Sequence, residues 1–194
     1  MSIRMATLAD IPAILAIYAP YVENTTFSFE YEVPSLEAFT ARFTAITAQF
    51  PWLVWEEGGA ILGYAYGSAP FERKAYQWCC EASIYLSPQA HRKGIGRKLY
   101  QVLEGLMQTQ GYRKCYALIT SPNEASLAFH RAMGYEFLVN FRDSGFKHGQ
   151  WLGVVWMEKE LNSVEIASKE PISINALVKS DKTFQRFLDI LPLS

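Results

Sequence analysis

The chain has 194 residues, of which 50% are hydrophobic and 19% are charged. This length is enough for one well-filled core and too short for two ordinary domains, so we expect a single domain with at most a tail. The 18 basic and 19 acidic residues nearly balance, which excludes the large positive field that would hold nucleic acid or an anionic membrane. Any anionic ligand must therefore be bound locally.

Targeting and redox features point to an ordinary cytoplasmic protein. The residues before Asp10 lack a basic flank followed by an apolar run, and no stretch reaches the ~20 apolar residues of a membrane span. The three cysteines are an odd number, and the side chains of Cys79 and Cys80 would point to opposite faces of a strand. We therefore expect buried thiols, with neither a disulfide framework nor a metal site.

Hydrophobic spacing divides the chain into alternating strands and helices. The expected elements are, in order, a strand at 3–6, helices at 11–21 and 36–50, strands at 52–55, 60–67 and 76–86, a helix directly behind residue 96, a strand at 113–120, a helix at 124–133, and strands at 135–141 and 151–161. A capping-box pattern at 7–10, a cap at Ser35, a hairpin turn at Gly58 and Gly59, and a C-cap at Gly134 support these boundaries. The order predicts a mixed α/β sheet layered by helices.

The last 33 positions, 162–194, form a tail behind a domain at 1–161. Four apolar residues in it are spaced i, i+3, i+4 and i+7 behind a cap at Asp181: Phe184, Phe187, Leu188 and Leu191. We expect a docking helix near 181–191, because a helix this short is marginal without packing. It would cover its own domain or dock on a second subunit.

The segment from His91 to Gly96 is a basic, glycine-containing loop that opens a helix. Unsatisfied N–H groups and the positive end of the helix dipole favour an anion there, and Arg92, Lys93 and Arg97 add charge, so a pyrophosphate is the natural occupant. The pattern is neither a P-loop nor a dinucleotide fingerprint, because no Gly-Lys-Ser/Thr follows and Leu99 stands at the third glycine position. Taken alone, it is equally typical of an ordinary tight turn.

Four segments together resemble the coenzyme A site of the GNAT acyltransferases, whose loop pattern is Gln/Arg-x-x-Gly-x-Gly/Ala: 83–86, 92–96, 123–126 and 130–135. The chain is similar, more closely, to the phosphinothricin and methionine sulfone N-acetyltransferase family over about 3–161. That similarity is carried by Ile17-Tyr18, Thr25-Thr26, 51–54, 63–65, 73–76, Glu81, Pro122-Asn123, Ser126, His130 and 146–151. The resemblance implies a GNAT fold, with a mixed, mostly antiparallel sheet of six to seven strands and helices on both faces, and a homodimer.

The resemblance also implies acetyl-CoA as co-substrate, without a metal. Loop amides would hold its pyrophosphate, the strand before the loop would pair with the pantetheine amides, and Asn123 would bond the pantetheine arm. Asn123 is equally typical of a plain helix N-cap. The implied coenzyme residues are Ile84, Tyr85, Leu86, Arg92, Lys93, Gly94, Ile95, Gly96, Arg97, Asn123 and Ser126.

Acetyl transfer to an amine needs a base, because an ammonium ion is no nucleophile. Glu81 lies in an otherwise apolar run, so burial would raise its pKa toward neutral pH. The alternative for such a carboxylate is a buried salt bridge. His130 stands where many GNAT enzymes carry a tyrosine acid, and it would either donate a proton to the departing thiolate or be a satisfied helix histidine.

The substrate side is implied by four further residues. Arg73 matches the family's Arg-x-Ala-Tyr element and could grip a carboxylate with two hydrogen bonds, unless it is a surface arginine. Phe29, Tyr76 and Trp151 could wall the pocket or belong to the core. We expect an N-acetyltransferase for a small amino-acid-like amine such as phosphinothricin, methionine sulfone or methionine sulfoximine.

Three positions depart from the family pattern: His91, Ser121 and Gly153. These departures concern substrate identity more than acetyl-CoA use. Two other functions share the fold, a non-catalytic acyl-CoA sensor and a protein or peptide N-acetyltransferase. A sensor would have no need of Glu81, and a protein acetyltransferase would present an open groove.

Overall fold

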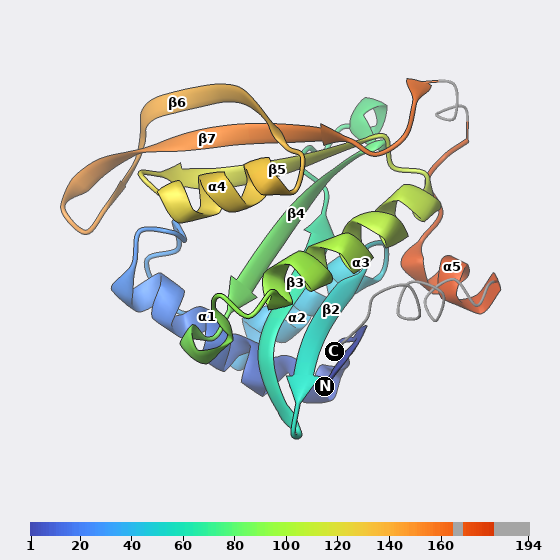
Figure 1. The fold of residues 1–194 in the computed structure, drawn as a ribbon, viewed down its shortest axis with the longest axis horizontal. Coiled ribbons are helices and arrows are strands. Elements are labelled where there is room, and N and C mark those ends of the chain that lie inside the picture. The colour runs from blue at the N-terminus through green and yellow to red at the C-terminus, as the bar shows by residue number, and fades with distance from the viewer. Residues whose placement is uncertain (165–168, 181–194) are drawn as a thin grey trace.

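The computed structural model describes residues 1–164 and 169–180. Its centre is a seven-stranded sheet in the order β1-β2-β3-β4-β5-β7-β6 (Figure 1). Every neighbouring pair is antiparallel except β4 and β5, so the expected mixed sheet is confirmed. The strands are β1 (Ser2–Met5), β2 (Trp52–Glu57), β3 (Ala60–Ser68), β4 (Cys79–Leu86), β5 (Lys114–Ser121), β6 (Glu136–Lys147) and β7 (Gln150–Glu160).

Helices cover both faces of this sheet, as expected. The α-helices are α1 (Ile11–Asn24), α2 (Leu36–Thr47), α3 (Ile95–Gln110), α4 (Glu124–Ala132) and α5 (Ile174–Ser180), and the short 3-10 helices are η1 (Leu8–Asp10), η2 (Lys74–Tyr76) and η3 (Pro88–Ala90). Trp52 and Val54 of β2 pack with α1 and α2, whereas Leu53 and Trp55 pack with α3 on the other face. Alternate side chains of a strand point to opposite faces, so β2 is buried on both sides.

Local signals in the sequence place several of these boundaries. The Ser35 hydroxyl accepts a hydrogen bond from the Ala38 N–H at 3.1 Å and caps α2. Gly58 and Gly59 both have positive φ angles, 58° and 80°, which suit the tight turn that joins β2 to β3.

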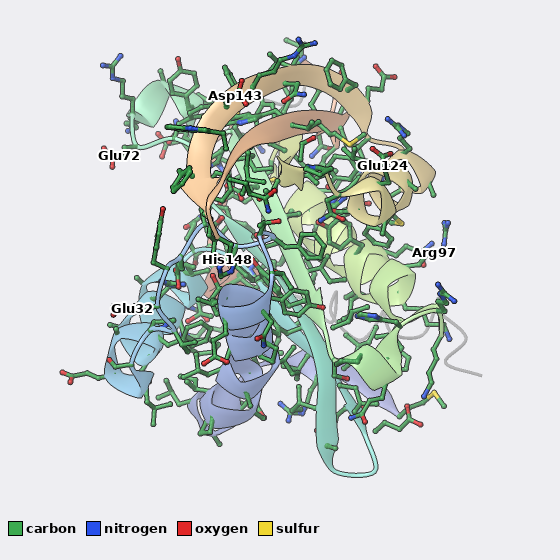
Figure 2. The ribbon with its side chains drawn as sticks, turned by 90° about the vertical axis from the view of Figure 1, so that its left-hand side faces the viewer. Glu32, Glu72, Arg97, Glu124, Asp143 and His148 are labelled. Atoms are coloured by element: carbon green, nitrogen blue, oxygen red, sulfur yellow. The ribbon has the colours of Figure 1, made fainter. Side chains whose placement is uncertain are left out.

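Charged side chains such as those of Glu32, Glu72 and Arg97 project outward from the ribbon (Figure 2). None of the described helices has the length and apolar character needed to cross a membrane.

Two strand boundaries differ from the sequence-based prediction. Tyr76 was expected to begin a strand, but it ends η2, because its N–H bonds the Arg73 carbonyl at 2.9 Å and closes a 3-10 turn. The strand expected at 135–141 continues to Lys147. Polar residues at 142–144 interrupt its hydrophobic pattern, and the pairing with β7 is irregular there and resumes at Gly145.

The tail carries one helix that the sequence analysis missed. The helix expected at 181–191 lies outside the described residues, whereas α5 precedes it. Ile174 and Leu177 of α5 are 1% and 4% exposed and join the core beside α3. Two apolar anchors in seven residues are too few for a periodicity to be recognised.

Candidate active site

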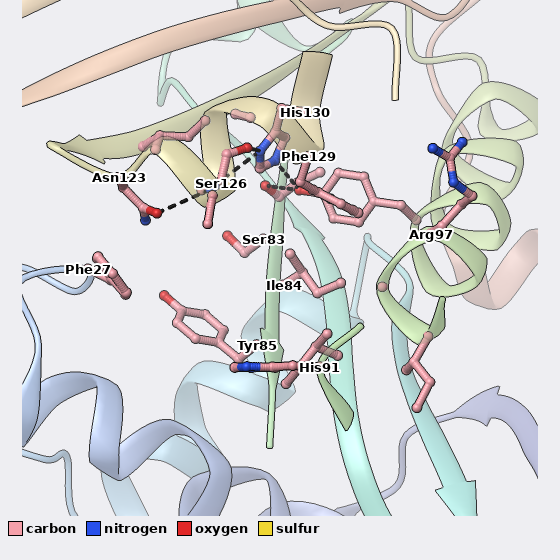
Figure 3. Close-up of a pocket in the computed structure, with 18 of the residues that line it drawn as sticks. Phe27, Ser83, Ile84, Tyr85, His91, Arg97, Asn123, Ser126, Phe129 and His130 are labelled. Atoms are coloured by element: carbon pink, nitrogen blue, oxygen red, sulfur yellow. Dashed lines mark hydrogen bonds between the residues drawn. The ribbon is translucent and has the colours of Figure 1, made fainter. Parts of the chain in front are cut away.

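The parallel pair β4 and β5 separates part of the way along its length. Cys79–Glu81 pairs with Lys114–Tyr116, and in the described chain no further backbone pairing joins the two strands. Beyond that point a cavity of about 600 Å³ opens between them, and residues 82–86 of β4 and 117–120 of β5 form two of its walls. The first turn of α3 and the helix α4 close the other sides (Figure 3).

Two tyrosine hydroxyls contact the ends of the open stretch of β4. The Tyr100 hydroxyl lies 3.0 Å from the Ala82 carbonyl, and the Tyr21 hydroxyl donates to the Leu86 carbonyl at 2.6 Å. Ile84 lies between these two positions and faces the cavity. Because β5 does not pair with this part of β4, the backbone groups of Ile84 can pair with the amides of an extended ligand, in the manner of an added strand.

The N-terminus of α3 forms one end of the cavity. Gly94 caps the helix with a φ of 76°, and Arg92 before it also has a positive φ, 61°. The first N–H groups of a helix have no intrahelical acceptor and carry the positive end of its dipole. Arg92 and Arg97 are exposed at the mouth, whereas Lys93 is exposed but does not line the cavity. This end can bind a pyrophosphate.

Asn123 and Ser126 contribute the wall from α4. The Asn123 side-chain oxygen accepts from the Ser126 N–H at 3.2 Å, as an N-cap does. This bond uses only the oxygen, so the amide nitrogen can still donate to a ligand in the cavity that Asn123 lines. The capping role and the coenzyme-binding role that the sequence left open are therefore compatible.

His130 is buried behind that wall, and both of its ring nitrogens have partners. Nδ1 lies 2.8 Å from the Ser126 carbonyl oxygen, and Nε2 lies 2.9 Å from the Tyr100 hydroxyl. A carbonyl only accepts, so Nδ1 carries the proton, and burial lowers the pKa of the ring and keeps it neutral. In this state Nε2 can only accept, so Nε2 and the Ala82 carbonyl oxygen compete for the single proton of the Tyr100 hydroxyl. Both ring nitrogens are engaged inside the protein, an arrangement that favours the structural role left open by the sequence.

Glu81 lies where the two strands part. Its neighbours Cys80 and Ala82 point into the core beside α3, so the Glu81 side chain is on the opposite face, the side of α1 and α2. Burial raises its pKa to about 7. Among the described residues Glu81 forms no ion pair, so the buried salt bridge considered above is not found.

The four residues expected around the substrate fall into two groups, and none lines the coenzyme cavity. Phe29 packs directly on Gly145, where a side chain would displace the Phe29 ring. The ring of Trp151 lies 5.3 Å from that of Phe146, the residue that follows Gly145. These contacts place Phe29 and Trp151 near the hairpin of β6 and β7.

Arg73 and Tyr76 form the second group, around η2. Arg73 is exposed, and the Tyr76 ring lies 4.6 Å from that of Phe71. The Phe71 ring is in turn 5.9 Å from that of Tyr116, which is the β5 partner of Glu81. Ring contacts therefore lead from Tyr76 to the residue that pairs with Glu81 in the sheet.

One departure from the family pattern lies where two strands approach closely. A Cβ atom at Gly153 would lie 2.8 Å from the Asn140 side-chain oxygen and 3.2 Å from the Phe141 carbonyl oxygen. A larger residue at this position would require the Asn140 side chain and the backbone of β6 to shift.

Sequence reasoning missed several residues that shape the site. Tyr21, Phe27, Tyr100 and Phe129 line the cavity. Lys147 was noted as part of a motif but given no role; its buried ammonium group donates to the carbonyls of Val22 and Ser28, both at 2.7 Å. These two bonds tie the loop that carries Phe27 and Phe29 to β6. No local pattern reveals a bond between residues so distant in the chain.

The open strand pair and the helix N-terminus suit an extended anionic ligand. The carboxyl group, where the strands part, can accept a proton. Comparison with known proteins identifies this class. A sequence profile described as "Acetyltransferase (GNAT) domain" matches residues 3–156. The chain belongs to the GNAT acetyltransferases.

Three relatives show how close the similarity is. The phosphinothricin N-acetyltransferase of Streptomyces viridochromogenes is 34% identical over 82% of this chain and 87% of its own. The L-methionine sulfoximine/L-methionine sulfone acetyltransferase of Pseudomonas paraeruginosa is 37% identical over 86% and 98%. The crystal structure of a phosphinothricin acetyltransferase from Sinorhizobium meliloti, in complex with AcCoA, superposes with a TM-score of 0.82 at 39% identity and covers 88% of this chain and 92% of its own.

A side chain at Gly96 should obstruct the cavity. A Cβ atom there would point at its walls, 3.4 Å from the terminal carbons of Ile84 and Leu86. We expect Gly96→Trp to weaken coenzyme A binding by more than about tenfold, or ~1.4 kcal/mol, in isothermal titration calorimetry. Gln101→Trp, at an exposed position of the same helix, is the control and should bind normally. Unchanged affinity in a folded Gly96→Trp protein would exclude the cavity as the coenzyme site.

Proposed function

We propose that this acetyltransferase moves the acetyl group of acetyl-CoA to the amino group of a small amino-acid-like substrate. The observation that carries the proposal is the position of Glu81, a partly buried carboxyl group with its pKa raised to about 7, where β4 and β5 separate. A base with a pKa near the working pH is ionised often enough to accept a proton and still holds that proton effectively.

The cavity fits the coenzyme. The cavity runs along the unpaired part of β4, which suits the two amides of a pantetheine arm. The N–H groups of α3 at the end of the cavity suit the pyrophosphate. When bound, acetyl-CoA supplies an acetyl group activated as a thioester. The relative from Sinorhizobium meliloti, which was crystallised with AcCoA, supports this choice.

In the proposed mechanism, Glu81 takes a proton from the ammonium group of the substrate and so produces the neutral amine that attacks the thioester carbonyl. The C–N bond forms, the nitrogen releases a second proton to water, the C–S bond breaks, and the thiolate takes up a proton. His130 is neutral, and its Nδ1 proton is directed at Ser126. It therefore has no proton to pass on through Nε2 and acts by positioning the Tyr100 hydroxyl, and water supplies the leaving group's proton.

The substrate class rests on the names of relatives and on Arg73. The curated relatives act on phosphinothricin or on methionine sulfoximine and sulfone, all of which carry an amino group beside a carboxylate. We assign the carboxylate to Arg73, whose guanidinium can form two parallel hydrogen bonds. Phe29, Tyr76 and Trp151 would then surround the side chain of the substrate. A non-catalytic sensor is disfavoured because it has no use for the Glu81 carboxyl group.

Replacing Glu81 by glutamine should remove the base and keep the shape of the side chain. We expect kcat/KM of Glu81→Gln to fall by roughly 10²- to 10⁴-fold near neutral pH, the range typical of general-base catalysis. The parent profile should rise with pH through a limb near 7, as the Glu81 carboxyl loses its proton. That limb should disappear in the variant, with partial recovery at high pH where free amine is abundant. Rates from pH 5.5 to 9.5 test this.

The matched variant is His130→Phe, which should cost less because a thiolate is a tolerable leaving group. Calorimetry should show nearly parental acetyl-CoA binding by Glu81→Gln. If His130→Phe is the more damaged protein, or if Glu81→Gln keeps the parent's rate and pH profile, then Glu81 is not the base.

Removing the Arg73 guanidinium should cost about tenfold to a hundredfold in kcat/KM, or ~1.5–3 kcal/mol, for an amino-acid substrate. Methionine sulfone and its decarboxylated analogue 3-(methylsulfonyl)propylamine separate the roles. For the analogue, Arg73→Ala should lose little, because no carboxylate remains to be bound. Equal losses for the two amines would place the role of Arg73 elsewhere.

We also propose a homodimer through β6. This edge strand exposes three large apolar side chains, since Phe137, Leu138 and Phe141 are 59%, 47% and 50% exposed, and such an edge favours association. The parent should sediment as a dimer, and a Phe137→Lys, Phe141→Lys double variant as a monomer, in velocity ultracentrifugation. A monomeric parent at micromolar concentration would refute the dimer.

A further inference from the structure

The described end of the chain, 169–180, lies beyond the matched GNAT domain, which ends at residue 156. It is held firmly to the domain. The Ile172 N–H bonds the Gln110 carbonyl at 2.9 Å, the Ile174 N–H bonds the Gln49 carbonyl at 3.0 Å, and Ile174 is buried in the core. The segment has therefore a fixed position from which its first residues can act on their neighbours.

Those first residues, Lys169 and Glu170, contact η2 and the residues that follow it, and we call this pair the clamp. The Glu170 carboxylate lies 3.1 Å from the Lys74 ammonium nitrogen and accepts from the Gln77 side-chain amide at 3.4 Å. The Lys169 carbonyl accepts from the Trp78 indole N–H at 2.9 Å. Three successive contacts thus join the clamp to the connection between β3 and β4.

These contacts hold both ends of a short turn. Helix η2 spans three residues, Lys74–Tyr76, with Arg73 as its N-cap and Gln77 as its C-cap. Lys74 and Gln77 stand at the two ends of the turn, and both bond Glu170. Arg73 directly precedes Lys74, and its carbonyl accepts from the Tyr76 N–H. Holding the two ends of the turn therefore restrains the backbone from which the Arg73 side chain projects.

We propose that the clamp fixes the backbone of η2 and thereby positions Arg73 to bind the carboxylate of the amine substrate. Glu170 is a positioning residue, which acts through Lys74 and Gln77. The inference rests on the proposed function of Arg73, and it adds a determinant of substrate affinity that lies outside the GNAT domain.

The contacts of the clamp are suited to orientation and add little to stability. The side chains of Lys74 and Glu170 are 80% and 65% exposed, and exposed ion pairs contribute little to the free energy of unfolding. Trp78 adds a hydrogen bond to a backbone carbonyl, which holds the end of the turn. Loss of Glu170 should therefore alter the turn and leave the fold intact.

Hydrogen–deuterium exchange tests the clamp without any substrate. In Glu170→Ala, deuterium uptake over residues 74–77 should be faster than in the parent, with an unchanged melting temperature. Lys179→Ala is the matched control, because it removes a charge from the same segment at the exposed end of α5. Unchanged uptake in Glu170→Ala would overturn the clamp, whatever the enzyme acetylates.

Kinetics test the link to Arg73. With methionine sulfone, Glu170→Ala should raise the amine KM by about three- to fivefold, the size expected for an exposed pair, and leave kcat and the Kd of coenzyme A unchanged. Glu170→Gln should restore a KM within about twofold of the parent, because its amide oxygen still accepts from Lys74 and Gln77. The Lys179→Ala control should match the parent.

A double-variant cycle separates this inference from the proposed function. The effect of Glu170→Ala should vanish with 3-(methylsulfonyl)propylamine, and also in an Arg73→Ala background. If Arg73→Ala lowers kcat/KM for methionine sulfone but Glu170→Ala leaves the KM unchanged, the clamp is wrong and the proposed function stands. If Arg73→Ala has no effect on either amine, the carboxylate assignment itself fails, and with it the role of the clamp.

Discussion

The separation of β4 from β5 is the constraint on which the site depends. Only Cys79–Glu81 pairs with β5, so the strand beyond has backbone groups that need other partners, because buried unpaired amides and carbonyls are costly. The Tyr21 hydroxyl donates to the Leu86 carbonyl and the Tyr100 hydroxyl lies 3.0 Å from the Ala82 carbonyl, and the stretch between these two positions faces the cavity. The same separation opens a cavity that ends at the N-terminus of α3, and Glu81 lies where the two strands part. In the proposed function, a single break in the sheet thus arranges anion binding, amide pairing and proton transfer.

Burial then gives the two titratable groups of the site different states. Removal from water disfavours whichever form is charged, so it raises the pKa of Glu81 to about 7 and lowers the pKa of His130. Near neutral pH the carboxyl group can therefore change its proton, whereas the imidazole stays neutral between Ser126 and Tyr100. One physical cause separates a group suited to proton transfer from a group suited to holding a hydroxyl in place.

The sequence predicted what local patterns encode. The loop before α3, the hairpin at Gly58, and the apolar setting of Glu81 all depend on residues within a few positions of each other, and the order of strands and helices followed from them. The features that the sequence did not predict are hydrogen bonds between residues far apart in the chain. The bond of Tyr21 to Leu86 spans 65 positions and that of Lys147 to Val22 spans 125, and no periodicity carries such information. Tyr76 was placed in a strand because aromatic residues favour strands, whereas a turn bond to Arg73 decided its conformation.

The two groups of residues expected around the substrate are held by bonds of different character. Lys147 is 1% exposed and donates two short bonds to the loop that carries Phe29, and breaking them would leave an unpaired charge in the interior, which is strongly unfavourable. The turn that carries Arg73 is held by exposed contacts of Glu170, which contribute little to the free energy of unfolding. In the proposed substrate site, the aromatic side is therefore anchored by buried bonds, and the side assigned to the carboxylate can be adjusted without loss of the fold. Because the clamp lies beyond the residues that the GNAT profile matches, our proposal implies that affinity for the amine can change while the coenzyme cavity and Glu81 remain as they are.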